Sequence, residues 1–194
     1  MPDPTTIAAR LAALPGGLTP GSADPARFPQ PVPAAVLVPI LTGPLPGILL
    51  TRRAAHLSRH AGQVAFPGGR IDPEDGGPEQ AALREAEEEV GLDPSLVQVL
   101  GRLPDFLTGT GYLVTPVVGV VPPDPALTPS PHEVDAVLQL PLSVLLDPAA
   151  PQRRQGILRG VMREFWVWPH PEHEIWGATA AILVGLAALL RGED

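Results

Sequence analysis

The chain has 194 residues, of which 44% are hydrophobic, so it can bury a core even though it carries 27 prolines and 20 glycines. Its formal net charge is −8 and it shows no basic stripe, which argues against duplex nucleic acid as a partner. The sequence contains no cysteine, so disulfide bonds and thiol catalysis are excluded.

The N-terminal part predicts a helix, a connector and a pair of strands. Residues 1–14 are expected to form a short amphipathic helix closed by a Pro-Gly-Gly stop, and a Pro- and Gly-rich connector runs on to residue 33. With Asp3 and no long apolar stretch, this segment predicts no signal peptide, and we expect a cytoplasmic protein. Residues 34–41 and 46–52 are apolar runs on either side of a Thr-Gly-Pro turn, and they predict two neighbouring strands, expected as a hairpin.

Residues 52–69 carry the densest positive cluster in the chain. Arginines in such a cluster could form an anion-binding wall, because a guanidinium group can bind two phosphate oxygens at once. The alternative is that these side chains only keep the surface soluble. The residues concerned are Arg52, Arg53, His56, Arg59 and His60.

The stretch from Phe66 to Leu92 predicts a glycine-rich loop followed by one short acidic helix. Gly76-Gly77 end any preceding element, Pro78 suits the first helical position, and Gly91 is the expected C-terminal stop. At about 100° per residue, three carboxylates share one face of this helix, and Arg84 lies one turn before the second of them. These carboxylates belong to Glu85, Glu88 and Glu89.

Carboxylates at this spacing repel one another by roughly a few tenths of a kcal/mol per pair in water. A hard divalent cation such as Mg²⁺ takes oxygen ligands and would remove that repulsion. The helix therefore predicts a metal-binding face, although a solvated acidic face would have the same composition.

The rest of the chain predicts further strands and a C-terminal helix. Expected strands cover residues 96–103, 113–121, 133–142 and 163–168, with a turn-rich loop at 104–112, a short helix near 141–146 and loop structure at 147–162. Pro116 lies inside the second of these strands and predicts an edge or bulge position for it. Residues 178–191 are apolar nearly all round but fall short of the about 20 residues that span a bilayer, so we expect a helix packed in the core.

The segment R-E-A-E-E-E-V-G-L (84–92) resembles the second half of the Nudix box, whose pattern is R-E-U-x-E-E-x-G-U with U a bulky apolar residue. The matching residues are Arg84, Glu85, Glu88, Glu89, Gly91 and Leu92. The first half departs from the pattern, because counting back from Arg84 places Arg70 where the box has glycine and Gly76 where it has glutamate. Gly69 and Asp75 (or Glu74) fit these two positions only if the loop is one residue longer.

A second segment, L-L-T-R-R-A…G-Q-V-A-F-P-G-G (49–69), resembles the additional motif of the coenzyme A diphosphatase branch of the Nudix family. As in that branch, it lies just upstream of the box. The second arginine of the motif falls on Ser58, so either the adjacent Arg59 substitutes for it or one contact is missing. The matching residues are Leu49, Leu50, Thr51, Arg53, Ala54, Gly62, Phe66, Pro67, Gly68 and Gly69.

These resemblances imply one Nudix hydrolase domain over residues 1–194, with its box at 66–92. The implied fold is an α/β/α sandwich, in which a mixed sheet lies between a loop-helix-loop catalytic motif and the C-terminal helix. The implied cofactor is Mg²⁺ or Mn²⁺, held by the carbonyl of Gly69 and the side chains of Glu85, Glu88 and Glu89. A box glutamate could act as the general base, or a loop acid could, with Glu133 as the first candidate and Asp105 as the second.

The implied reaction is hydrolysis of the diphosphate bond of coenzyme A or a derivative to 3′,5′-ADP and 4′-phosphopantetheine. Alternatives are hydrolysis of ADP-ribose or a dinucleotide such as NADH, and a catalytically silent module that senses a nucleotide. A small molecule is the expected partner, without nucleic acid or membrane, and the protein is expected to be a monomer or a homodimer. The expected substrate contacts are Arg53, Arg59, His60 and Phe66, and the expected structural supports are Arg84 and Gly91.

Overall fold

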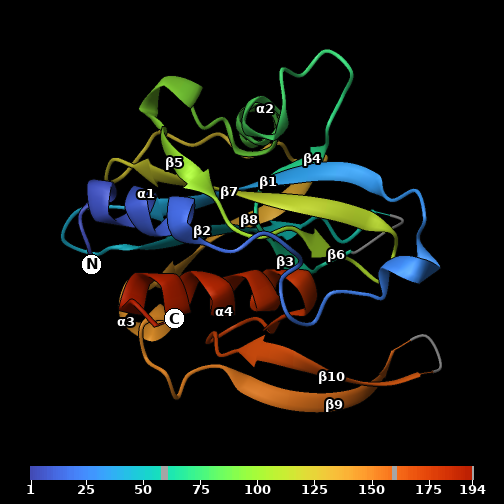
Figure 1. Cartoon of the computed structure of the whole chain (residues 1–194). Helices are drawn as coiled ribbons and strands as arrows, with labels where there is room; N and C mark the ends of the chain where they lie inside the picture. Colours follow the sequence, from blue (N-terminus) through green and yellow to red (C-terminus); the bar gives the residue numbers. More distant parts are fainter. Residues whose placement is uncertain (58–60, 159–160, 194) are drawn as a thin grey trace.

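The computed structural model describes residues 1–57, 61–158 and 161–193. In this part of the chain the strands form a large mixed sheet and a smaller antiparallel sheet, and helices cover both faces of the large one (Figure 1). The large sheet contains β1 (Val32–Leu41), β2 (Gly47–Arg53), β3 (Val64–Ala65), β4 (Gly68–Arg70), β5 (Gln98–Arg102), β6 (Phe106–Leu107), β7 (Tyr112–Val121) and β8 (Val134–Pro141). The small sheet contains β9 (Gln152–Leu158), β10 (Val161–Trp168) and β11 (Ile175–Trp176). The helices are α1 (Pro4–Ala13), α2 (Pro78–Val90), α3 (Leu142–Leu145) and α4 (Gly177–Arg191), with single 3₁₀ turns at Pro25–Arg27 and Pro94–Leu96.

A long parallel pair, β1 and β7, forms the centre of the large sheet and is in register from Val32 opposite Tyr112 to Leu41 opposite Val121. On its other side, the C-terminal end of β1 pairs with β2 in the expected antiparallel arrangement, and β8 pairs along the far edge of β2. The N-terminal half of β1 pairs instead with β4. This change of neighbour brings the glycines of β4 beneath helix α2.

Helices α2 and α4 bury opposite faces of this sheet, which makes the fold the expected α/β/α sandwich. Ala82, Ala86 and Val90 of α2 belong to one apolar cluster with residues of β1, β2 and β7. Leu183 and Leu186 of α4 belong to a second, larger cluster on the other face. Burial of these two apolar helix stripes supplies the main driving force for the layered arrangement.

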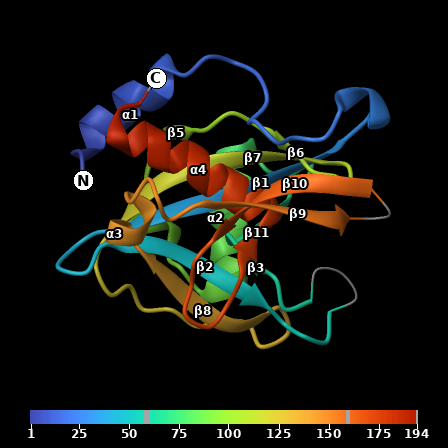
Figure 2. The same ribbon diagram turned by 90° about the horizontal axis from the view of Figure 1, so that it is seen from below.

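The two chain ends lie side by side on the α4 layer, where α1 runs next to the end of α4 (Figure 2). The guanidinium group of Arg10 donates hydrogen bonds to the carbonyl oxygens of Leu189 (2.8 Å) and Leu190 (2.9 Å). Carbonyls in the last turn of a helix lack the usual intrahelical partners, and Arg10 supplies donors to both of these; the Leu189 carbonyl also accepts a hydrogen bond from the N–H of the C-cap Gly192 at 3.2 Å. Among the described residues, no helix is long and apolar enough to cross a membrane.

Residues 113–121 were expected to take an edge or bulge position, and the edge alternative is wrong, because β7 lies inside the sheet between β1 and β5. The irregularity lies in the neighbouring strand, where the register of β5 shifts between Val99 and Gly101. Pro116 is tolerated in β7 because the neighbouring strand is interrupted. β5 ends at Arg102 and β6 begins at Phe106, and the gap lies opposite Pro116. The carbonyl of Pro116 accepts a hydrogen bond from the Leu103 N–H at 3.0 Å, so its missing N–H faces this same gap and interrupts no ladder.

The expected loop at 147–162 is also a partial error, since β9 occupies Gln152–Leu158 within it. This segment lacks the apolar alternation of a typical strand. Cross-strand contacts hold it against β10 instead: Arg153 pairs with Glu164, and its guanidinium group lies 4.1 Å from the ring centre of Trp166. Such pairs form only once β10 is in place, so the local pattern does not reveal them.

Candidate active site

Helix α2 begins and ends where the sequence predicts. Gly77 adopts a φ of 140° immediately before Pro78, and Gly91 closes the helix in the left-handed conformation with a φ of 68°. A Cβ atom on Gly91 would lie 3.0 Å from the backbone nitrogen of Thr128. Glycine at this position therefore ends the helix and also lets the connection between β7 and β8 pack against it.

The carboxylate of Glu89 is the buried centre of the candidate site. Glu89 is 3% exposed, and one of its carboxylate oxygens lies 3.5 Å from the guanidinium group of Arg53 at the end of β2. The other accepts a hydrogen bond from the backbone N–H of Gly68 at 3.3 Å. Burial raises the pKa of Glu89 to about 7; Arg53 and Gly68 oppose this rise, and the nearby charges of Glu133 and Glu85 add to it.

The carboxylate of Glu85 lies between Arg84 and β4. Arg84 donates a hydrogen bond to it at 3.1 Å, and a Cβ atom built on Gly69 would stand only 2.3 Å from Glu85 Oε1. Glycine is thus required at position 69 for this carboxylate to keep its place. Burial raises the pKa of Glu85; Arg84 opposes that effect, and the charges of Glu88 and Glu133 reinforce it.

Arg84 connects the loop to the helix through several hydrogen bonds. It donates to both carboxylate oxygens of Asp75, at 3.0 and 2.9 Å, and to the carbonyl oxygen of Arg70 at 3.1 Å. As its spacing predicts, it also reaches Glu88, at 3.3 Å. The hydrogen bonds from Arg84 are the main reason why the pKa of Asp75 is lowered. Asp75 therefore holds the Arg84 guanidinium group in place, and Arg84 in turn positions the carboxylates of Glu85 and Glu88.

Asp75 has a role that residue counting alone did not assign. In the sequence, Gly69 and Asp75 lie one residue out of register with the box pattern. A turn absorbs the extra residue: the Asp72 N–H donates to the Asp75 carboxylate at 2.8 Å, and the Asp75 N–H donates to the Asp72 carbonyl at 3.0 Å. If the box pattern is allowed a loop one residue longer, Asp75 falls on its acidic position, and the sequence then predicts that this acid pairs with Arg84.

The connection between β7 and β8 brings Glu133 to the same region. The N–H of Ser130 donates to the Glu89 carbonyl at 2.9 Å, and the N–H of Ala54 donates to the Glu133 carbonyl at 2.8 Å. Glu133 is exposed, and its charge acts on both Glu85 and Glu89. Asp105, the second candidate, accepts a hydrogen bond from the Thr115 hydroxyl at 2.8 Å and is not among the charges that perturb Glu85 and Glu89.

The remaining expected site residues fall into two groups. Arg59 and His60 lie outside the described residues, as does Ser58. Phe66 is 4% exposed and belongs to the apolar cluster on the α4 side of the sheet, so its ring has little surface to offer a substrate. The fold therefore brings Arg53 to Glu89 and Gly69 to Glu85, while Phe66 packs inside the fold.

The donor set fits a hard divalent cation. Among the described residues, no three His, Asp or Glu side chains are already arranged as a ligand set, because Glu85 and Glu88 turn to Arg84 while Glu89 faces Arg53. Two of these carboxylates are costly to ionise where they stand, and their charges repel, so a cation bound by their oxygens would relieve both effects. Arg84 would keep Asp75 as a partner if the glutamates turned away from it.

A glycine-lined loop and an acidic helix pack together on a mixed sheet, and comparison with known proteins identifies the family that has this arrangement. The model of the NUDIX domain matches residues 31–160, and the chain belongs to the Nudix family. It is 48% identical over 154 residues to the uncharacterized Nudix hydrolase NudL of Escherichia coli strain K12, which covers 79% of this chain and 80% of the relative.

Other matches agree with this assignment. The protein of the same name from Shigella boydii serotype 18 shows the same identity over the same shares of the two chains. Among solved structures, a MutT/nudix family protein from Enterococcus faecalis has a TM-score of 0.50 and 15% identity, covering 84% of this chain and 63% of that one. That likeness supports the fold alone.

Proposed function

We propose that this Nudix hydrolase cleaves the diphosphate bond of coenzyme A or a coenzyme A derivative with the help of Mg²⁺ or Mn²⁺. The products are 3′,5′-ADP and 4′-phosphopantetheine, or its acylated form. One observation carries the proposal: the two motifs meet at a single carboxylate. Arg53 and Gly68, both from the segment that resembles the coenzyme A diphosphatase motif, contact Glu89 from the box. The segment that resembles the coenzyme A diphosphatase motif thus lies directly against the helix that carries the box glutamates.

The residues that would hold the cation are Glu85, Glu88 and Glu89, together with the carbonyl oxygen of Gly69. When bound, such a cation neutralises phosphate charge and lowers the pKa of a coordinated water. Arg84 orients two of these carboxylates, and Asp75 keeps Arg84 in place.

Arg53 is the residue placed to bind an anionic oxygen of the substrate. Its side chain is 30% exposed, and the ion pair that it forms with Glu89 is 3.5 Å long. A diphosphate oxygen can therefore share this guanidinium group without breaking a tight pair. Since a diphosphate is already anionic, such positive groups stabilise the additional charge that develops during attack.

Glu133 is our assignment for the general base. The box glutamates cannot hold a cation and accept a proton at the same oxygen, whereas Glu133 is exposed and its charge acts on both Glu85 and Glu89. In this assignment the Glu133 carboxylate does not hold the cation, so it can accept a proton from the attacking water. The Ala54 and Ser130 hydrogen bonds hold its backbone between β2 and the end of α2.

The test is a substrate panel of coenzyme A, ADP-ribose and NADH, assayed with and without Mg²⁺, with products separated by chromatography. We expect metal-dependent cleavage of coenzyme A, loss of activity in Glu89→Gln, and a fall of roughly 100-fold or more in kcat for Glu133→Gln. Glu87→Gln is the matched control, because Glu87 lies on the same helix and is exposed.

Two results would contradict the proposal. Cleavage of ADP-ribose or NADH without cleavage of coenzyme A would assign a different substrate to the same chemistry. Unchanged turnover in Glu89→Gln would reject the mechanism based on the acidic helix.

A further inference from the structure

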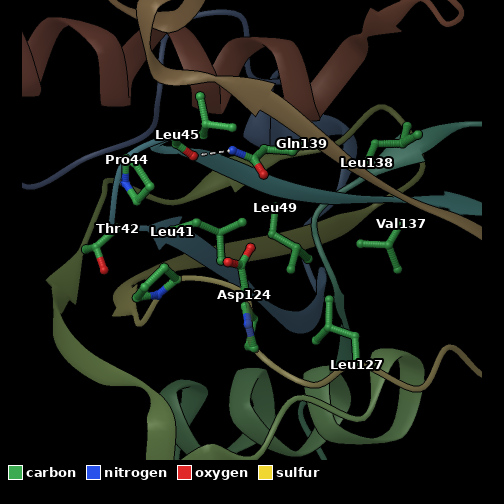
Figure 3. Close-up of a pocket in the computed structure, with 12 residues that line it drawn as sticks. Leu41, Thr42, Pro44, Leu45, Leu49, Asp124, Leu127, Val137, Leu138 and Gln139 are labelled. Carbon is green, nitrogen blue, oxygen red and sulfur yellow. Dashed lines mark hydrogen bonds between the residues drawn. The ribbon is translucent and has the colours of Figure 1, made fainter.

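A pocket of about 340 Å³ opens on the α2 side of the sheet, where β2 and β8 meet two connecting loops (Figure 3). This volume lies within the range of about 300–1,000 Å³ that small-molecule clefts occupy. Its walls are mainly apolar and include Leu41, Leu49, Leu127 and Val137. The pocket therefore suits a ligand segment with methyl and methylene groups.

One carboxylate faces this apolar space. Asp124 is the charged residue among those that line the pocket, and its side chain points toward Leu41 and Leu49 (Figure 3). With a φ of 49°, it is the non-glycine residue that adopts a positive φ in the described part of the chain. Aspartate tolerates this conformation better than most residues do. The turn therefore carries a carboxylate side chain at a position where glycine is more usual.

The charge of the pocket decides which end of a substrate it can take. A phosphate or a nucleotide carrying a 3′-phosphate would be repelled by Asp124, and no arginine, lysine or histidine is among the described residues that line the pocket to offset that repulsion. A neutral chain that carries amide N–H groups would instead donate a hydrogen bond to the carboxylate. The pantetheine arm of coenzyme A has this composition, with two amides, a dimethyl branch and several methylene groups.

The pocket also lies on the same sheet face as the candidate active site. Side chains alternate along β2, so every second residue from Leu49 points to the same face of the sheet. Leu49 in the pocket and Arg53 at the active site therefore share the α2 side. From Leu49 to Arg53 the strand advances about 13 Å, at about 3.3 Å per residue. An extended pantetheine arm is about 15 Å long if each of its bonds adds the same length as a bond in an extended polypeptide backbone. A diphosphate at Arg53 thus leaves the arm long enough to reach the pocket.

From these observations we infer that the pocket between β2, β8 and the Asp124 loop binds the pantetheine arm of the substrate, with Asp124 accepting an amide N–H. This inference rests on the proposed coenzyme A activity and goes beyond it, because it assigns the two halves of the substrate to opposite sides of the cluster of box glutamates. The nucleotide half lies away from the pocket, and the thiol or acyl end enters it.

The experiment measures binding of the two reaction products by calorimetry, so that no turnover is needed. The variants are Asp124→Asn, which keeps a residue that tolerates the same φ, and Val137→Phe, which fills the pocket from β8. For both, the Kd for 4′-phosphopantetheine should rise about tenfold, while the Kd for 3′,5′-ADP stays as in the wild type. Glu87→Gln removes one exposed negative charge elsewhere and should change neither Kd.

The outcomes separate the pocket from the activity. If both variants bind 4′-phosphopantetheine as tightly as the wild type does, or if the wild type does not bind it, the pocket assignment is overturned even where coenzyme A is cleaved. If the wild type cleaves no coenzyme A but the selective loss is seen, the proposed function fails while the pocket assignment is supported. Should Val137→Phe fail to fold, as a thermal melt would show, Asp124→Asn decides the question alone.

Discussion

The buried carboxylate of Glu89 should make the stability of the metal-free protein fall as pH rises. Burial moves its pKa from the ordinary value of 4.5 to about 7 in the folded state. Below pH 4.5 the group is protonated in both the folded and the unfolded chain. Between that value and about 7 the unfolded chain loses the proton first, so the folded state binds more protons and the free energy of unfolding decreases. Above pH 7 the loss is complete.

The expected decrease in the free energy of unfolding follows from the size of the pKa shift of Glu89. Each pKa unit corresponds to about 1.4 kcal/mol, so the free energy of unfolding should drop by about 3 kcal/mol across this window. For a chain of this length, such a change lowers Tm by about 6–12 °C. Adding Mg²⁺ at pH 8 should recover stability, because a bound cation favours ionised carboxylates.

The assay is thermal or urea unfolding in EDTA from pH 4.5 to pH 8, for the wild type and Glu89→Gln. The five histidines and the other titrating groups are present in both proteins, so the difference between the two stability curves isolates Glu89. The wild type should lose stability relative to the variant as pH rises, and Glu87→Gln should follow the wild-type curve. If Glu89→Gln shows the same pH slope as the wild type, the reasoning from burial is refuted.

Three further predictions concern the loop and the ends of the helix. Gly69→Ala should lower kcat by roughly 100-fold, because the new Cβ would displace the Glu85 carboxylate by about 1 Å or more. Asp75→Asn removes the charged partner of Arg84, and the Mg²⁺ concentration needed for half-maximal activity should rise about tenfold. Gly91→Ala forces alanine into a φ of 68° and brings its Cβ atom to 3.0 Å from the backbone nitrogen of Thr128, which should destabilise the fold by about 1–2 kcal/mol and lower Tm.

Each of these predictions has a result that would contradict it. Wild-type kcat in Gly69→Ala would mean that Glu85 does not need its present position. An unchanged Mg²⁺ requirement in Asp75→Asn, measured by metal titration, would remove Asp75 from the site. For Gly91→Ala the matched control is Gly185→Ala in the interior of α4, where nothing lies within 4 Å of the new Cβ, and equal Tm values for the two variants would argue against strain at Gly91.

The local sequence determined the elements whose causes are local. Helix α2 starts and ends at its flanking glycines because backbone conformations near Gly77 and Gly91 depend on those residues themselves. The shared face of Glu85, Glu88 and Glu89 follows from helical periodicity alone. Their approach to Arg84 needs no more than neighbouring turns of one helix.

Tertiary structure alone decided the features that depend on distant segments. The central place of β7, despite Pro116, depends on a gap between β5 and β6. The contact of Arg53 with Glu89 requires the end of β2 to meet the C-terminal part of α2, and the pKa of Glu89 depends on how deeply packing buries its carboxylate. A sequence shows which side chains can carry charge; only the packed fold decides which of them lose water and which partners they meet, and that loss of water makes an acidic helix a candidate active site.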